Sequence, residues 1–143
     1  KYQKLPLDRI PELFSGRAVR LGSYGEPTLI PVPVLRAMIG KASNFTGYTH
    51  RWRSPLFQGY KAFLMASCDS VADRQEATAR GWRTFRVMTR LDLDSREVLC
   101  PATTARKANC ETCGLCKGLS IQAKSVGILV HGIGKSNFQE RGI

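Results

Sequence analysis

The feature that most limits the fold is the alternation of strand-like and helix-like segments over residues 17–88. Apolar or β-branched runs typical of strands occupy residues 17–21, 45–50, 60–67 and 82–88. Helices are expected over residues 34–39, after two prolines that a first helical turn tolerates, and over residues 71–80, between the N-cap Ser70 and Gly81. Parallel strands need such intervening segments. The pattern therefore predicts an α/β fold with a small, mainly parallel sheet, arranged as open βα units or as part of a barrel.

The length of 143 residues predicts a single domain over residues 1–143. Within it we expect an α/β core over residues 17–99, a metal-binding loop over residues 100–118, and a C-terminal strand and tail over residues 119–143. Hydrophobic residues make up 43 % of the chain, which is enough to bury an ordinary core without help from a metal. No apolar run approaches the ~18 residues of a membrane span, so no membrane partner is expected.

Four of the five cysteines lie close together and are the strongest chemical signal in the chain. Cys110, Cys113 and Cys116 are spaced three apart, which lets a tight loop wrap one face of a cubane, and Cys100 is followed by proline, as is the remote cysteine of bacterial ferredoxins. The pattern predicts a [4Fe–4S] cluster bound by all four. A Zn²⁺ ion is the main alternative, although zinc sites more often use two separated Cys-x-x-Cys pairs, and disulfides or free thiols are a third. Cys68 stands apart and is expected to be a small buried residue.

Both histidines and two carboxylates lie at the ends of predicted strands. These residues are Glu26, His50, Asp69 and His131. Because the carboxyl ends of parallel strands meet at one edge of a sheet, where binding sites collect, we expect a cleft there with these side chains around it. Asp69 has a second interpretation, as an acceptor of backbone hydrogen bonds at the start of the helix that follows it.

The chain is strongly basic. It contains 22 Lys and Arg against 11 Asp and Glu, a formal charge of +11, which predicts contact with nucleic acid or another polyanion, or with a larger protein assembly. The segment His50, Arg51, Trp52 and Arg53 combines groups that stack on bases with groups that neutralise phosphates, and is the candidate nucleic-acid contact. The alternative interpretation is a strand end with a tryptophan in the core and solvated arginines.

Several blocks together resemble a known family. They are residues 19–27 (VRLGSYGEP), 47–52 (GYTHRW), 66–70 (ASCDS), 81–86 (GWRTFR), and Cys100-Pro101 followed by residues 110–116 (CETCGLC). Their order is similar to that in a family of uncharacterised proteins encoded by bacteriophages and other mobile elements, over about residues 17–138. The resemblance implies a mobile-element origin but no particular reaction. Together with the clustered cysteines, which do not form the spread, even set of a secreted disulfide framework, it predicts the reducing cytoplasm of a bacterial host.

Two functions fit these observations. The first is a metal-binding accessory protein, in which the cluster or ion closes the loop over residues 100–118 and the basic surface contacts nucleic acid or an assembly. The second is an iron–sulfur or other metal-dependent enzyme, or part of one, with its site at the carboxyl ends of the strands. A structural centre is closed by its own ligands, whereas a catalytic one adjoins a cavity with ionisable groups, so exposure separates the two.

Overall fold

The structure, a computed structural model, describes residues 4–104, 108–132 and 138. Within these residues the chain forms a six-stranded sheet in which every neighbouring pair is parallel. The strands are β1 (Ala18–Leu21), β2 (Asn44–Thr49), β3 (Met65–Cys68), β4 (Thr84–Met88), β5 (Glu97–Leu99) and β6 (Ser125–Leu129). Their order is β1-β2-β3-β4-β6-β5, with β1 and β5 at the two edges of an open sheet. The predicted α/β fold with a parallel sheet is confirmed, and the sheet does not close into a barrel.

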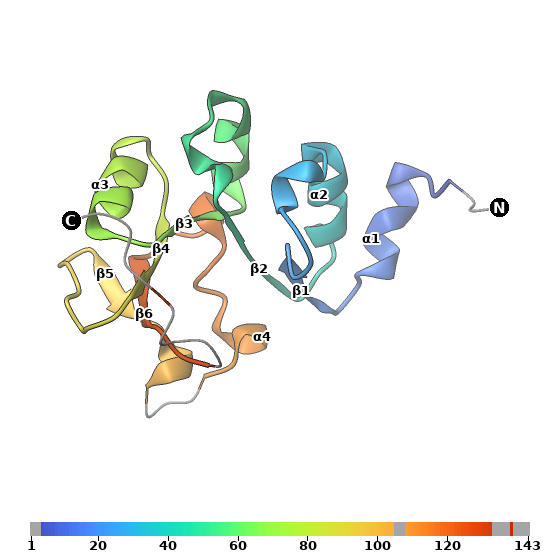
Figure 1. The fold of residues 1–143 in the computed structure, drawn as a ribbon. Helices are drawn as coiled ribbons and strands as arrows, with labels where there is room; N and C mark the ends of the chain where they lie inside the picture. Colours follow the sequence, from blue (N-terminus) through green and yellow to red (C-terminus); the bar gives the residue numbers. More distant parts are fainter. Residues whose placement is uncertain (1–3, 105–107, 133–137, 139–143) are drawn as a thin grey trace.

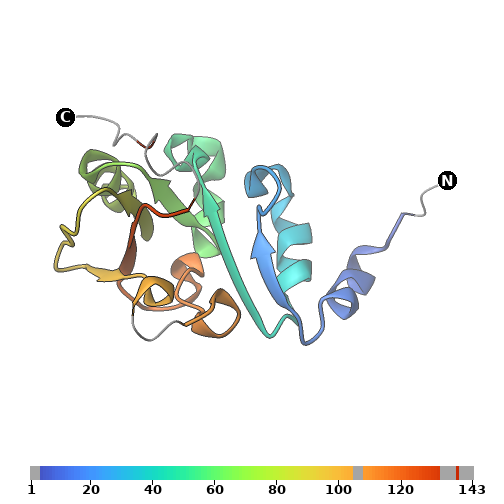
Figure 2. The same ribbon diagram turned by 60° about the horizontal axis from the view of Figure 1, so that its bottom comes forward.

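The helical segments lie on both faces of the sheet, but unequally. The helices are α1 (Ile10–Leu13), α2 (Val32–Ile39), α3 (Val71–Ala79) and α4 (Cys110–Cys113), and short 3₁₀ segments include residues 51–53, 55–62 and 101–103. Figure 1 shows α1, α2 and α3 along one side of the sheet and α4 with the rest of the cysteine segment on the other. Figure 2 shows the same separation from a second direction.

The order of the strands explains this separation. From β1 to β4 each strand is placed beside the one before it, and the segments between them cover one face. The chain then passes to the edge strand β5 and returns to insert β6 between β4 and β5. Because crossovers between parallel strands are right-handed, a step in the reverse direction carries its connection over the opposite face. That connection is the segment that holds the cysteines.

Period-two alternation along the strands gives each face its own core. On the helix side, Leu21, Ala66 and Cys68 are buried together with Leu35 and Trp52. On the cysteine side a smaller cluster is formed by Met65, Val126 and Cys116, against which further apolar side chains pack, namely Tyr48, Phe85, Val98, Cys100 and Leu115. Buried parallel strands are apolar on both faces, which is the pattern seen here.

Most predicted elements are confirmed to within two residues, and one is partly wrong. The predicted strand over residues 60–67 begins only at Met65, because residues 60–62 end a 3₁₀ segment. Tyr60 accounts for the difference: its hydroxyl donates to the carbonyl of Ile30 at 2.8 Å, and its own carbonyl accepts from the N–H groups of Phe63 and Leu64, both at 2.9 Å. Every residue of the run is buried or half-buried, so its apolar character alone could not separate the turn from the strand.

A buried ion pair joins β4 to the edge strand β5. The guanidinium of Arg86 donates to both carboxylate oxygens of Glu97, from Nε at 3.0 Å and from Nη2 at 2.8 Å, and to Asp92 Oδ1 at 2.8 Å. Arg86 reaches Glu97 across β6 next to Gly127, its partner in register, which has no side chain. These contacts raise the pKa of Arg86 above its ordinary value. The pair fixes the position of β5 and therefore of Cys100, which follows it.

Among residues 4–104, 108–132 and 138, no helix has both the length and the apolar character needed to span a bilayer. Parts of the predicted C-terminal tail, residues 133–137 and 139–143, lie outside the described residues.

Candidate metal centre and its cavity

A cavity of about 550 Å³ lies on the cysteine side of the sheet, near the carboxyl ends of the strands. Its wall includes Arg20, Thr46, Tyr48, Ser67, Phe85, Val87, Val126 and Ile128 from five strands, all four clustered cysteines, and residues that follow β1, β2 and β6. The strand order reverses between β4 and β5, and the crevice at such a reversal is where ligands bind in open parallel sheets. The sequence predicts a cleft at this edge, and the structure has one.

The four cysteines reach the cavity from separate parts of one connection. Cys100 follows β5 directly, and its N–H donates to the carbonyl of Gly127 on β6 at 2.8 Å. Cys110 and Cys113 are the first and last residues of the single-turn helix α4, and Cys116 follows after Gly114, which has a left-handed φ of 64°. Cys110 is exposed, Cys100 and Cys113 are half-buried, and Cys116 is buried.

Polar contacts to β2 hold the cysteine segment against the sheet. The side-chain N–H₂ of Asn44 donates to the carbonyl of Glu111 at 2.6 Å, and the N–H of Gly47 donates to the carbonyl of Cys116 at 3.1 Å. Asn109 caps α4, since its Oδ1 accepts from the backbone N–H of Thr112 at 3.0 Å. Buried amide groups of this kind specify position because leaving them unpaired is costly.

The end of the segment is fixed by close packing against the 3₁₀ segment over residues 55–62 and the start of β3. A Cβ added to Gly118 would lie 2.5 Å from the carbonyl oxygen of Lys61 and 2.7 Å from the backbone of Leu64. The carbonyl of Gly118 accepts from Arg83 Nη1 at 2.8 Å, and Ser120 Oγ donates to the carbonyl of Ala62 at 2.6 Å. The chain therefore passes from Cys116 to β6 along one defined path.

The thiols are close enough to affect one another. Burial raises the pKa of Cys116 to about 11, with further increases from Cys100, Cys110 and Cys113 and a decrease from a hydrogen bond with Tyr48. Burial also raises the pKa of Cys100, to which Cys110 and Cys113 add. The pKa of Tyr48 is raised by burial and by Cys116. A cation or cluster would favour the thiolate forms and oppose these shifts, because metal ligands are deprotonated.

Within the part of the chain that the structure describes, no group of three or more His, Cys, Asp or Glu side chains is positioned to hold a metal ion. All four clustered cysteines nevertheless line the same cavity.

Three of the four predicted pocket residues line this cavity. They are Glu26, His50 and His131. The carboxylate of Glu26 is also engaged in the turn after β1: its Oε1 accepts from the N–H of Thr28 at 3.2 Å and its Oε2 from the N–H of His50 at 3.4 Å. Asp69 does not line the cavity. Its N–H donates to Asp73 at 3.1 Å beside the start of α3, where Ser70 provides the cap.

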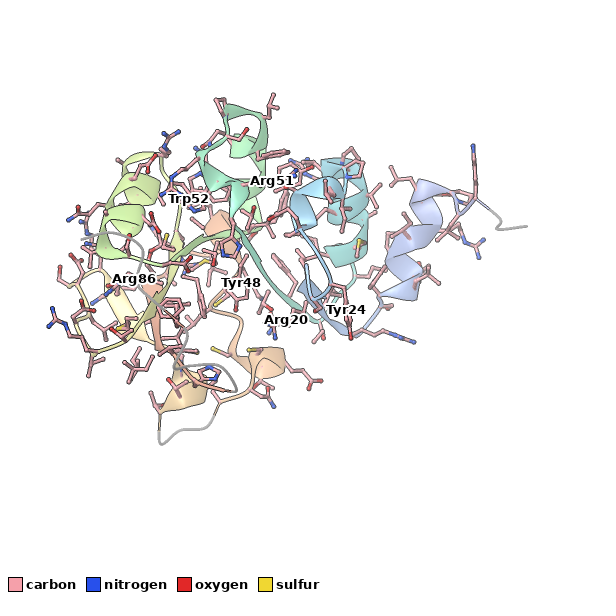
Figure 3. All side chains as sticks on the ribbon, viewed as in Figure 1. Arg20, Tyr24, Tyr48, Arg51, Trp52 and Arg86 are labelled. Carbon is pink, nitrogen blue, oxygen red and sulfur yellow. The ribbon has the colours of Figure 1, made fainter. Side chains whose placement is uncertain are left out.

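The predicted nucleic-acid segment divides into buried and exposed residues. Trp52 is 1 % exposed and donates its indole N–H to the carbonyl of Ser67 at 2.9 Å, so its ring belongs to the core. Arg53 lies over that ring at 4.0 Å and pairs with carboxylates on α3. His50 and Arg51 are exposed, with His50 on the cavity wall. Figure 3 shows Trp52 on the helix side of the sheet, whereas Tyr48 and Arg20 lie toward the cysteine segment.

Arg20 and Tyr48 are cavity residues that the sequence analysis does not single out. Each lies inside a strand rather than after one, so a search of strand ends misses it. The signal available in the sequence is the alternation of side chains between the two faces of a strand. Arg20 alternates with the helix-facing Val19 and Leu21, and Tyr48 lies three residues after Phe45, which packs on the helix side.

Comparison with known proteins adds no relative. No protein-family model, curated protein or solved structure matches this chain.

Proposed function

We propose that the protein holds a [4Fe–4S] cluster through Cys100, Cys110, Cys113 and Cys116, with Zn²⁺ as the alternative, and that it is an enzyme, or part of one, acting on a ligand in the adjoining cavity. The observation that carries this proposal is that all four cysteines line the same cavity as His50 and His131.

The cavity supports the enzyme over the accessory protein. In a structural metal centre four protein ligands fill every coordination position, so the centre has no use for an adjoining cavity. The volume of about 550 Å³ falls among those of small-molecule sites, and Cys110 is exposed. The packing of Cys116 against Met65 and Val126 favours the accessory alternative. A metal centre bound through Cys116 would also fix the cysteine segment to the sheet.

The spacing of the cysteines along the chain supports a cluster over a single ion. Cys110, Cys113 and Cys116 are three residues apart, as in bacterial ferredoxins, whereas zinc sites more often use two separated Cys-x-x-Cys pairs.

A bound cluster supplies electron transfer, and a bound zinc ion supplies Lewis-acid activation. The chain's own residues provide the rest. The imidazoles of His50 and His131 can hydrogen-bond to a ligand from the carboxyl ends of β2 and β6. Apolar side chains, including Phe85, Val87 and Ile128, form another part of the wall.

The test is metal and sulfide analysis with absorption spectroscopy on protein purified without oxygen. We expect about four iron per chain and a broad absorbance near about 400 nm. Cys113→Ser should lose both, whereas Cys68→Ser, the matched control, should keep them because Cys68 is buried on the helix side. Protein with about one zinc per chain would support the alternative metal. Metal-free wild-type protein, or full occupancy in Cys113→Ser, would refute the proposal.

A further inference from the structure

Tyr24 is a fully exposed aromatic residue beside the cavity. Its side chain is 102 % exposed, and it lies in the turn after β1. Gly22 and Gly25, on either side, have left-handed φ angles of 77° and 91°, and both line the cavity. Burying an aromatic ring is normally favourable. A fully exposed ring in such a turn has its faces open and is suited to stacking against a flat ligand.

An exposed arginine, Arg20, lines the cavity from β1. Among the described residues it forms no ion pair with a carboxylate, whereas Arg53 pairs with Asp73 and Glu76. Arg51 does not line the cavity, because its guanidinium lies 5.4 Å from the ring centre of Phe57, which packs on the helix side. The net charge of +11 adds a field that attracts anions to this edge.

The inner wall is aromatic as well. The rings of Tyr48 and Phe85 lie 4.5 Å apart with a tilt of 47°, and both line the cavity with the cysteines. A base within a duplex is stacked and paired, so it cannot reach a recessed wall without leaving the helix. An unpaired base can enter such a space while its phosphates remain outside.

We infer that a single-stranded nucleic acid binds across the mouth of this cavity, with one base stacked on Tyr24, a phosphate held by Arg20, and a neighbouring base directed toward the cysteine wall. The inference rests on the proposed function, because it names the substrate class of the same site. Aromatic stacking combined with cations that follow the backbone is how single strands are bound without regard to sequence.

The experiment measures fluorescence anisotropy of labelled dT and U oligomers of about twelve nucleotides, and of a duplex of the same length, with the protein as purified. Tyr24→Ala should weaken single-strand binding roughly 5- to 150-fold, the range expected for one stacked base. Leu56→Ala, which removes another largely exposed apolar side chain that is not part of the cavity lining, should change it less than about two-fold. Arg20→Gln should reduce the slope of log K against log salt by about 0.7, as for one lost phosphate contact. The reduction should be larger than for Arg90→Gln, which changes an exposed arginine after β4 that does not line the cavity.

Three results would overturn the inference: binding unaffected by Tyr24→Ala, equal effects of Arg20→Gln and Arg90→Gln, or tighter binding of the duplex than of the single strands. Metal content, measured on the same samples, keeps the two proposals separate. Metal-loaded protein that binds no single strand refutes this inference alone. Metal-free protein that binds single strands through Tyr24 refutes only the metal centre.

Discussion

The substitution Glu97→Gln removes one charge from the buried pair that joins β4 to β5. The side chain of Glu97 is 0 % exposed and that of Arg86 is 1 % exposed. Glu97 accepts two hydrogen bonds from Arg86 and a third from the N–H of Asp94 at 3.0 Å. The amide keeps the shape but has only one acceptor oxygen and directs an N–H₂ toward a guanidinium. Among the residues that the structure describes, the substitution therefore leaves buried Arg86 with Asp92 as its one charged partner.

The expected cost is about 3–5 kcal/mol in the free energy of unfolding, the range for breaking a buried ion pair by removing one partner. With a urea m-value of about 2 kcal/mol/M, the unfolding midpoint should fall by about 1.5–2.5 M. Asp92→Asn is the matched control. Asp92 is 31 % exposed and its backbone carbonyl also accepts from Arg86 Nη2 at 3.2 Å, so loss of its charge should cost less than loss of the Glu97 charge.

Urea unfolding followed by circular dichroism measures these differences. The double variant Arg86→Met with Glu97→Leu provides a second check, because replacing a whole buried pair by apolar residues is often neutral. It should be more stable than Glu97→Gln alone. A midpoint shift below about 0.5 M for Glu97→Gln, or a double variant less stable than the single one, would refute the reasoning that an unpaired buried charge dominates.

Two further predictions concern packing and a buried thiol. Gly118→Ala should destabilise the protein by about 2–4 kcal/mol in urea unfolding, because a side chain at φ +54° would meet the backbone of Lys61 and Leu64. Gly59→Ala is the control and should be close to neutral, because the space around Gly59 is open. Equal costs for the two substitutions would contradict this account. Burial raises the pKa of Cys68 to about 12 from an ordinary value of 9.0. Between these two pH values the unfolded chain loses the thiol proton while the folded chain keeps it. The free energy of unfolding therefore falls with rising pH by up to about 1.4 kcal/mol per pH unit. Cys68→Ala should show a shallower fall above pH 9.0 in urea unfolding of metal-free protein, and an unchanged slope would contradict the prediction.

The positions of the elements could be predicted because their signals are local. Ser70 and Gly81 mark the ends of α3, since a side-chain oxygen caps the first turn and a left-handed residue ends the last. The run over residues 60–67 failed as a single strand because its first residues end a 3₁₀ segment, in which the hydroxyl of Tyr60 donates to the carbonyl of Ile30, a residue distant in sequence.

The candidate site was only partly visible from the sequence. Glu26, His50 and His131 line the cavity as expected, since each follows a parallel strand. Asp69 has the same sequence position relative to β3, but it lies beside the start of α3 instead. Trp52 and His50 are two residues apart, yet one is buried on the helix side and the other borders the cavity.

By itself the sequence determined most of the strands and helices over residues 17–88, that the sheet is mainly parallel, and that four cysteines lie close together along the chain. Periodicity, caps and spacing are properties of neighbouring residues, so a single chain displays them. Only the tertiary structure decided that β6 returns between β4 and β5, beside the Arg86–Glu97 pair, and that the cysteine segment therefore crosses the face opposite the helices. That choice depends on the handedness of crossovers and on packing between residues far apart in the chain, and it is what brings the cysteines, the histidines and Arg20 around one cavity.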